Sequence, residues 1–140
     1  MTQDQIALVR ATFAMIEPMA EQTVLLFYTR LSETAPQARV RFASPAMAVR
    51  GRKLMTALAR VIAVIDHEVR LAAELAELTR LLGRFGFTER NVPELGGALL
   101  WTLQRGLGPG AFTPPVREAW AAALDRIAAA TDAAEHSAAA

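Results

Sequence analysis

The stretch Leu78-Thr79-Arg80-Leu81-Leu82-Gly83-Arg84-Phe85-Gly86-Phe87 decides the fold of this 140-residue chain. Together with the residues before it, the stretch places leucine at positions 71, 75, 78 and 82. Intervals of four, three and four residues put these side chains on one face of an α-helix. Gly83 follows the last of them and is expected to stop the helix. We expect the leucine face to be buried in the core.

Amphipathic helices are expected on both sides of this stretch. Thr2 and Gln5 form a capping-box pattern that opens the first helix, and Pro18 is expected to end or kink it. Further helices are predicted over residues 19–32, 36–40, 45–66, 91–106 and from 114 onward. No segment shows the alternation of a half-buried strand. These patterns predict one all-α domain of six or seven helices over residues 1–131, followed by an alanine-rich flexible tail at 132–140.

The composition of the chain narrows the classes of function. Its formal net charge is +1, with acidic and basic residues interspersed, so neither nucleic acid nor a membrane surface is expected as a partner. No apolar run approaches the roughly 20 residues of a membrane span. The polar residues 2–5 do not resemble a signal peptide, which predicts a cytoplasmic protein. The sequence contains no cysteine and no motif of known catalytic chemistry, so we expect neither disulfides nor enzymatic activity.

Short pieces of the chain, collinear and nearly free of gaps, resemble the globin domain of flavohaemoglobins and of single-domain bacterial haemoglobins. The stretch quoted above is similar to the segment that passes beneath the haem in that family. The other pieces are Phe27-Tyr28, Arg52-Lys53-Leu54-Met55, residues 97–103, Gly106-Leu107-Gly108, residues 111–114 and residues 117–120. The resemblance implies a globin fold with a three-over-three arrangement of helices. It also implies a bound haem that takes up oxygen or nitric oxide.

The resemblance also assigns positions around the haem pocket. Tyr28 matches the distal tyrosine, whose hydroxyl faces the bound gas, and Phe42 matches the phenylalanine that lies flat on the porphyrin. Arg50 stands where these globins commonly have a distal glutamine, and Leu54 matches the apolar residue one turn further along. Phe85 matches an aromatic residue near the opposite, proximal side.

Two positions on the proximal side depart from the family pattern. Leu82 replaces the histidine that forms the protein's bond to iron, and Val92 replaces a tyrosine that supports this side in flavohaemoglobins. His67 lies about four helical turns before Leu82, and His136 lies far along the chain from it, so neither histidine takes its place. Because leucine cannot ligate iron, we expect the protein to carry little or no haem.

Three classes of function are consistent with the sequence. The leading hypothesis is a haem-free globin that acts as a regulatory or interaction module, with Leu82 filling part of the pocket. The second is a haem protein that binds oxygen or nitric oxide through non-standard ligation, in which Tyr28 is the best remaining iron ligand. The third is a binder of another apolar ligand, such as a fatty acid or a tetrapyrrole, whose carboxylate pairs with Arg50 or Lys53.

For some side chains, the sequence is consistent with two different roles. Arg50 and Lys53 reach either an anionic group at the pocket mouth or only solvent. Trp101 and Trp120 belong either to helix packing or to the interface of a homodimer. His67 is expected to be an exposed residue at a helix end.

Overall fold

The computed structural model describes residues 1–35, 47–88 and 91–139. Its helices are α1 (Gln3–Ile16), α2 (Ala20–Thr34), α4 (Met47–Ala63), α5 (Glu68–Arg84), α6 (Val92–Leu107) and α7 (Pro114–Ala139), with a short 3-10 helix, η1 (Glu17–Met19), between α1 and α2. No strand occurs in these three ranges, and the all-α class is confirmed. None of the helices described is long and apolar enough to cross a membrane. The helix expected at 36–40 and the side chain of Phe42 lie outside the described residues.

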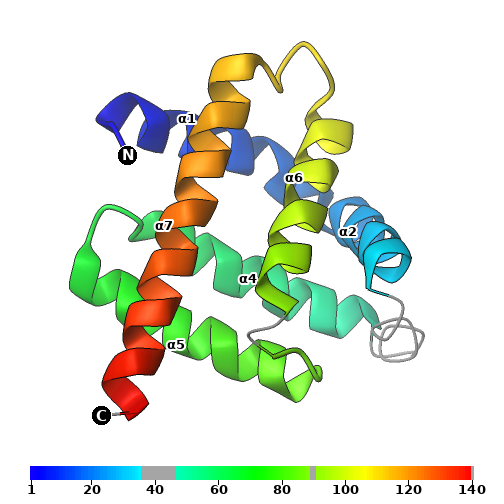
Figure 1. Cartoon of the computed structure of the whole chain (residues 1–140). Helices are drawn as coiled ribbons and strands as arrows, with labels where there is room; N and C mark the ends of the chain where they lie inside the picture. Colours follow the sequence, from blue (N-terminus) through cyan, green and yellow to red (C-terminus); the bar gives the residue numbers. More distant parts are fainter. Residues whose placement is uncertain (36–46, 89–90, 140) are drawn as a thin grey trace.

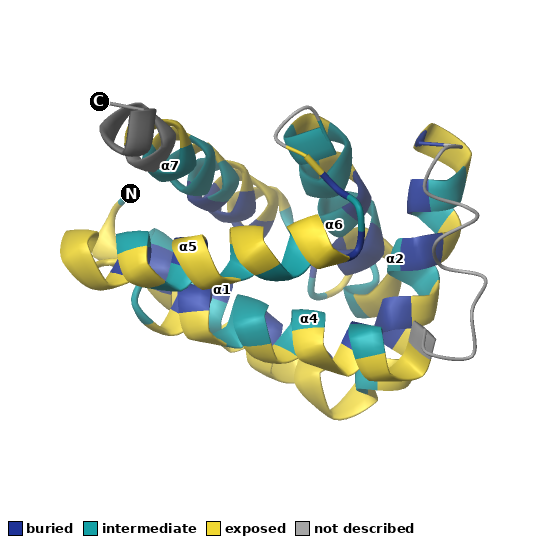
Figure 2. Ribbon diagram, turned by 90° about the horizontal axis from the view of Figure 1, so that it is seen from below, coloured by how far each residue is buried: buried dark blue, intermediate teal, exposed yellow. Residues whose placement is uncertain are grey.

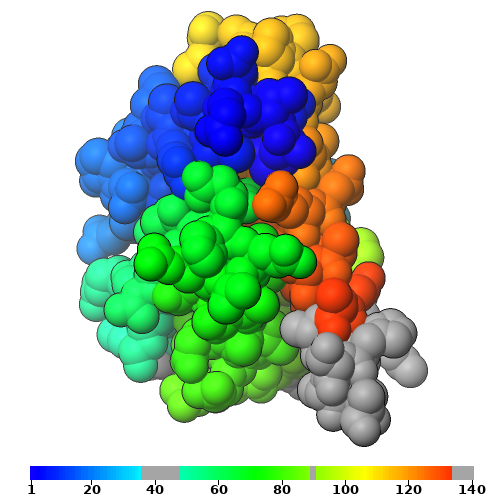
Figure 3. Space-filling view, turned by 90° about the vertical axis from the view of Figure 1, so that its left-hand side faces the viewer, coloured from blue at the N-terminus to red at the C-terminus, as the bar shows by residue number. Residues whose placement is uncertain are grey.

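The helices surround a common interior. α6 and α7 run steeply across α4 and α5 (Figure 1). α1 packs along α7, and α2 packs against both α4 and α6. Seen from the side, α5 lies below α1 and beside α7 (Figure 3). The outer faces of α4 and α5 are exposed, whereas buried residues of the helices are turned toward one another (Figure 2).

The start and end of α1 follow the sequence pattern. Thr2 Oγ1 accepts a hydrogen bond from the Gln5 amide, and the Thr2 amide donates to Gln5 Oε1, both at 3.0 Å. This reciprocal pair is the predicted capping box. Pro18 lies in η1, directly after α1. A proline inside the helix would remove a backbone hydrogen bond and clash with the preceding turn, so α1 ends where predicted.

The larger core cluster brings α1 and α7 together. It includes the buried side chains Ile6, Val9, Phe13, Ile16, Leu103, Val116 and Trp120. The Trp120 ring is fully buried, and its Nε1 donates a hydrogen bond of 2.9 Å to Thr12 Oγ1. Trp120 therefore serves helix packing within the chain. Trp101 of α6 is partly exposed, and the guanidinium groups of Arg30 and Arg105 lie 5.5 and 5.3 Å from its ring centre.

Arg10 of α1 closes the C-terminal end of α4. Its Nη2 donates to the Ala63 carbonyl at 3.0 Å and to Asp66 Oδ1 at 2.9 Å, and its Nε donates to the Ile62 carbonyl at 3.4 Å. The last carbonyls of a helix have no partner inside the helix, so a cation placed there stabilises the helix end. α4 accordingly ends at Ala63, three residues before the predicted end at 66.

Later helix ends agree only partly with the sequence pattern. His67 is exposed and caps α5, with its Nδ1 accepting a hydrogen bond from the Arg70 amide at 3.3 Å, so the prediction of an exposed histidine at a helix end is confirmed. Gly83, expected to stop α5, lies in its last turn, and the helix ends one residue later. α7 continues to Ala139, so the residues assigned by pattern to a tail continue the last helix.

α2 and α4 approach closely where they cross at Gly51. A Cβ atom at this position would overlap Val24 Cγ1 and would lie 3.0 Å from Val24 Cβ and Cγ2. Glycine is therefore the residue that lets the two helices pass at this separation. The crossing holds together the helices that carry Tyr28 and Leu54.

Candidate functional site

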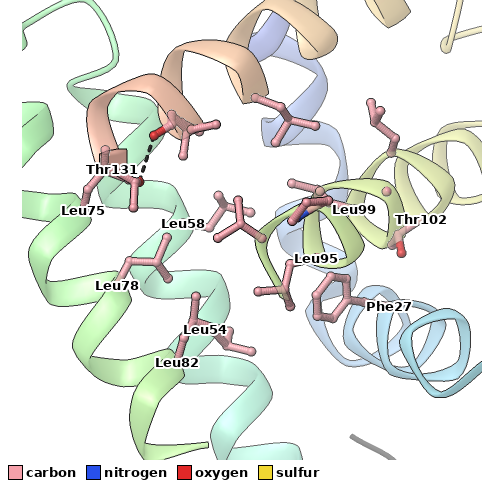
Figure 4. Close-up of a pocket in the computed structure, with 18 of the residues that line it drawn as sticks. Phe27, Leu54, Leu58, Leu75, Leu78, Leu82, Leu95, Leu99, Thr102 and Thr131 are labelled. Atoms are coloured by element: carbon pink, nitrogen blue, oxygen red, sulfur yellow. Dashed lines mark hydrogen bonds between the residues drawn. The ribbon is translucent and has the colours of Figure 1, made fainter. Parts of the chain in front are cut away.

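The interior contains a cavity of about 540 Å³, bounded by α2, α4, α5, α6 and α7 (Figure 4). Its walls are mainly hydrocarbon and include Val24, Phe27, Leu54, Met55, Leu58, Leu75, Leu78, Leu82, Leu95, Leu99, Leu124 and Ile127. Small-molecule pockets in proteins commonly have volumes of roughly 300–1,000 Å³ and mostly apolar linings. The cavity therefore has the size and chemistry of a ligand site.

The leucine face of α5 is divided between the core and this cavity. Leu71 is buried in a cluster with Val61 of α4. Leu78 and Leu82 are only partly buried, and they point into the cavity (Figure 4). Burial of the whole leucine face was the expectation, and it holds for the first half of the helix. The second half supplies cavity wall instead, since α6 and α7 do not close over it.

Three threonine hydroxyls in the lining donate hydrogen bonds to main-chain carbonyls. The pairs are Thr102 to Ala98 at 2.7 Å, Thr131 to Ile127 at 2.8 Å and Thr23 to Ile16 at 3.4 Å. A hydroxyl has a single proton, so each of these groups can only accept a hydrogen bond from a ligand. These three positions thus offer a ligand only acceptors, and the other hydroxyls of the lining are those of Thr79 at an exposed position and of the buried Tyr28.

The cavity opens between α5, α6 and α7. The exposed residues of its lining mark this mouth: Thr79, Pro93, Gly97, Ala121 and Asp125. Most lining residues of α2, including Tyr28, are buried, so α2 forms the closed end. Among the described lining residues, Asp125 is the one that carries a charge at neutral pH.

Tyr28 lies at the closed end, and only 2% of its surface is exposed. Burial raises the pKa of its phenol to about 12, and the nearby Arg50 guanidinium acts in the opposite direction. Its ring packs against Phe27, with ring centres 5.8 Å apart. The phenol is neutral at physiological pH, because burial disfavours the charged form.

The structure places four of the predicted pocket residues on the cavity wall: Tyr28, Leu54, Leu82 and Val92. Phe85 is buried in a cluster that also contains Tyr28 and Leu82. Phe42 lies outside the described residues.

Neither of the two cations assigned to the pocket mouth is part of the cavity lining, although Arg50 lies near Tyr28. The Arg50 guanidinium lies over the Phe85 ring, 5.3 Å from its centre. Lys53 is exposed and lines a separate polar groove between the outer faces of α4 and α5. In the described part of the chain, no arginine or lysine lines the cavity itself. A carboxylate inside the cavity would therefore lack the cationic partner that the sequence suggested.

α7 contributes a wall that the sequence reasoning did not include. Leu124, Ile127, Ala128 and Thr131 all line the cavity. Residues three and four positions apart share one face of a helix, so a search for this spacing along α7 could have found them. The spacing alone does not separate a face toward a cavity from a face toward the core.

Comparison with known proteins agrees with this architecture. The sequence model of the Globin family matches residues 25–131. The chain belongs to the globin family. A flavohemoprotein from Vibrio cholerae serotype O1 is 29% identical to this globin over 126 residues, which cover 88% of the globin and 32% of the relative. The globin thus spans about a third of the length of that relative. The predicted globin fold and the resemblance to a bacterial globin domain are confirmed.

Membership of the globin family implies a haem. The cavity of this globin suits the porphyrin of a haem but not its iron. The apolar walls suit the faces of a porphyrin. Iron in haem proteins is held by histidine, cysteine, methionine or tyrosine. The described lining contains no histidine, and its side chains of the other kinds are Tyr28 and Met55. Within the described residues there is also no group of three or more histidines and acidic residues that could hold a metal ion. The residues present do not fit an iron bond of the usual globin kind.

Proposed function

We propose that this globin binds a small apolar ligand in its cavity, without a histidine-ligated haem. The observation that supports the proposal is the cavity itself, with about 540 Å³ left between mainly hydrocarbon walls although Leu82 projects into it. Leu82 does not close the pocket. An apolar ligand is therefore the occupant that the geometry favours.

The energetics of the cavity also favour an occupant. An empty apolar cavity destabilises a fold because the atoms that line it lose packing partners. Solvent at the mouth lowers this cost, but water gains little against hydrocarbon walls. An apolar ligand removes the same surface from water and stabilises the fold.

Binding of Nile red, a neutral dye whose emission reports the polarity of its surroundings, tests the proposal. We expect saturable binding at one equivalent with a blue-shifted emission. Leu58→Trp adds bulk inside the cavity and should weaken binding at least about tenfold, or about 1.4 kcal/mol. Val69→Trp is the matched control, because Val69 is 76% exposed and outside the cavity lining. Absence of saturable binding, or equal affinities of the two variants, would contradict the proposal.

A hemin titration tests the statement about haem. We expect a broad absorbance change and loss of the pigment on a desalting column, because no described lining residue is a histidine. A sharp Soret band at one equivalent, retained through the column, would instead support the haem-protein hypothesis.

An interaction role is a second proposal, supported by the surface around Trp101. This ring is partly exposed on α6 and lies against two guanidinium groups. Tryptophan and arginine are enriched at protein interfaces. A homodimer through α6 should appear in sedimentation velocity and should be lost in Trp101→Ala, whereas a monomer at all concentrations would argue against it. A cytoplasmic location stays a prediction.

A further inference from the structure

The cavity has two chemically different ends, which determines how an amphiphilic ligand would lie in it. The closed end is formed by buried residues of α2, and the mouth is formed by exposed residues of α5, α6 and α7. A polar head group that entered the closed end would lose its hydration without an equivalent replacement. The head is therefore expected at the mouth, with the apolar chain extending toward Phe27 (Figure 4).

Two groups near the mouth favour a head that donates hydrogen bonds. The Asp125 carboxylate is exposed on α7 and is part of the cavity lining. Thr131 lies at the end of the cavity away from Phe27 (Figure 4), and its proton is already donated to the Ile127 carbonyl at 2.8 Å. Its oxygen can then only accept a hydrogen bond. A carboxylate has no proton to donate, and it is repelled by Asp125.

Arg50 and Lys53, the cations that the sequence suggested for a carboxylate, are not part of the cavity lining. Arg50 lies over the Phe85 ring, and Lys53 lies in the outer groove between α4 and α5. A fatty acid with its head at the mouth would therefore place its charge beside Asp125, without a cation in the described lining to receive it. That position is unfavourable compared with bulk water.

We infer that the cavity selects amphiphiles by their head group and binds long-chain amines and alcohols in preference to fatty acids. This inference rests on the proposed function and names its ligand class. It replaces the carboxylate ligand that the sequence suggested with a ligand whose head is a hydrogen-bond donor.

Competition with Nile red tests the inference with three ligands of equal chain length: dodecylamine, dodecanol and dodecanoate, each below the concentration at which it forms micelles. An exposed ion pair changes affinity by up to about fivefold, and attraction of one head and repulsion of the other act together. We expect dodecylamine to bind about tenfold more tightly than dodecanoate, with dodecanol between them. High salt should reduce the difference, because it screens charges at an exposed mouth.

Two variants identify the group responsible. Asp125→Asn should lower the affinity for dodecylamine by about three- to fivefold. The same change should raise the affinity for dodecanoate and leave that for dodecanol unchanged. Glu118→Gln is the matched control, since it removes the same charge from the same helix, about 10 Å along its axis, at an exposed residue outside the cavity lining. It should leave the order of the three ligands unchanged.

The outcomes separate this inference from the proposed function. If Nile red and dodecanol bind but dodecanoate binds as tightly as dodecylamine, the head-group inference is wrong and the apolar site stands. The same holds if Asp125→Asn and Glu118→Gln have equal effects. If neither Nile red nor any of the three amphiphiles binds, the proposed function fails, and the inference fails with it.

Discussion

Gly51→Ala perturbs the crossing of α2 and α4, where the structure leaves no room for a side chain. An added Cβ would overlap Val24 Cγ1. Val24 is buried and β-branched, and such a residue in a helix has one strongly preferred rotamer. Its methyl group cannot turn aside cheaply, so the new methyl group must push the two helices apart.

Two opposing effects set the magnitude. Overpacking a close-packed contact costs about 1–3 kcal/mol, and overlap with a stiff side chain favours the upper end of that range. Alanine in place of a helix-interior glycine stabilises by about 1 kcal/mol. We expect the free energy of unfolding to fall by about 2 kcal/mol in total. For a domain of this size, that loss lowers Tm by about 8 °C.

Thermal unfolding followed by circular dichroism measures this effect. Gly97→Ala is the control, because a Cβ at Gly97 of α6 would meet no atom within 4 Å. The free energy of unfolding of Gly97→Ala should rise by about 1 kcal/mol and its Tm by about 4 °C. Adding Val24→Ala to Gly51→Ala should recover about 1–2 kcal/mol relative to the sum of the single changes, because it removes the overlapping atom. A Gly51→Ala protein that unfolds at or above the wild-type temperature would refute the reasoning.

Three further predictions concern single groups. Leu82→His places an imidazole on the cavity wall. This variant should retain hemin at one equivalent with a sharp Soret band. Loss of hemin on desalting would show that a side chain on this wall cannot reach iron. The pKa of the Asp66 carboxyl is lowered, first by a hydrogen bond from the Asp66 backbone amide and then by the Arg10 guanidinium. This group therefore stabilises the fold above its unfolded pKa of about 3.9, and the contribution is lost as the pH falls through the folded pKa. Asp66→Asn should flatten the acid side of the stability profile measured by urea unfolding, and an unchanged profile would count against the role of this pair. Tyr28 is the single tyrosine of the chain, and its pKa of about 12 predicts little phenolate absorbance from the folded protein at about pH 10. Stability should fall as the pH rises from about 10 toward 12, because only the unfolded chain ionises there; a normal titration midpoint would show that the phenol is hydrated.

The helices of this protein are predictable because their signals are local. The Thr2–Gln5 capping box and Pro18 act within one or two turns, and the structure contains both features. The leucine face of α5 is equally visible in the sequence. Whether a given leucine on that face meets the core or a cavity depends on α6 and α7, which lie far along the chain, so periodicity alone could not separate Leu71 from Leu82.

The positions of the cations show a second limit of local reasoning. Neighbouring residues in an α-helix point about 100° apart, so Lys53 and Leu54 cannot face the same space. Leu54 lines the cavity, and Lys53 faces the outer groove. Assigning either residue to the pocket mouth requires the rotation of α4 about its own axis. That rotation is set by contacts such as the one between Gly51 and Val24.

The amphipathic pattern of α7 ends before the helix itself does. Residues after Thr131 lack an amphipathic stripe, which favoured a tail. Alanine has the highest intrinsic helix propensity, so an alanine-rich segment can continue a helix without a buried face. Propensity rather than periodicity was the informative signal there, and α7 extends to Ala139.

The hydrogen bond from Trp120 to Thr12 joins residues 108 positions apart, and this separation has a consequence for synthesis of the protein. A ribosome adds roughly 5–20 residues per second, so Thr12 leaves the peptidyl-transferase centre about 5–20 s before its partner is made. During that interval the apolar face of α1, with Val9 and Phe13, has no α7 to pack against. Completion of the main core must therefore wait until α7 has been made, and until then the apolar face of α1 is open to a chaperone.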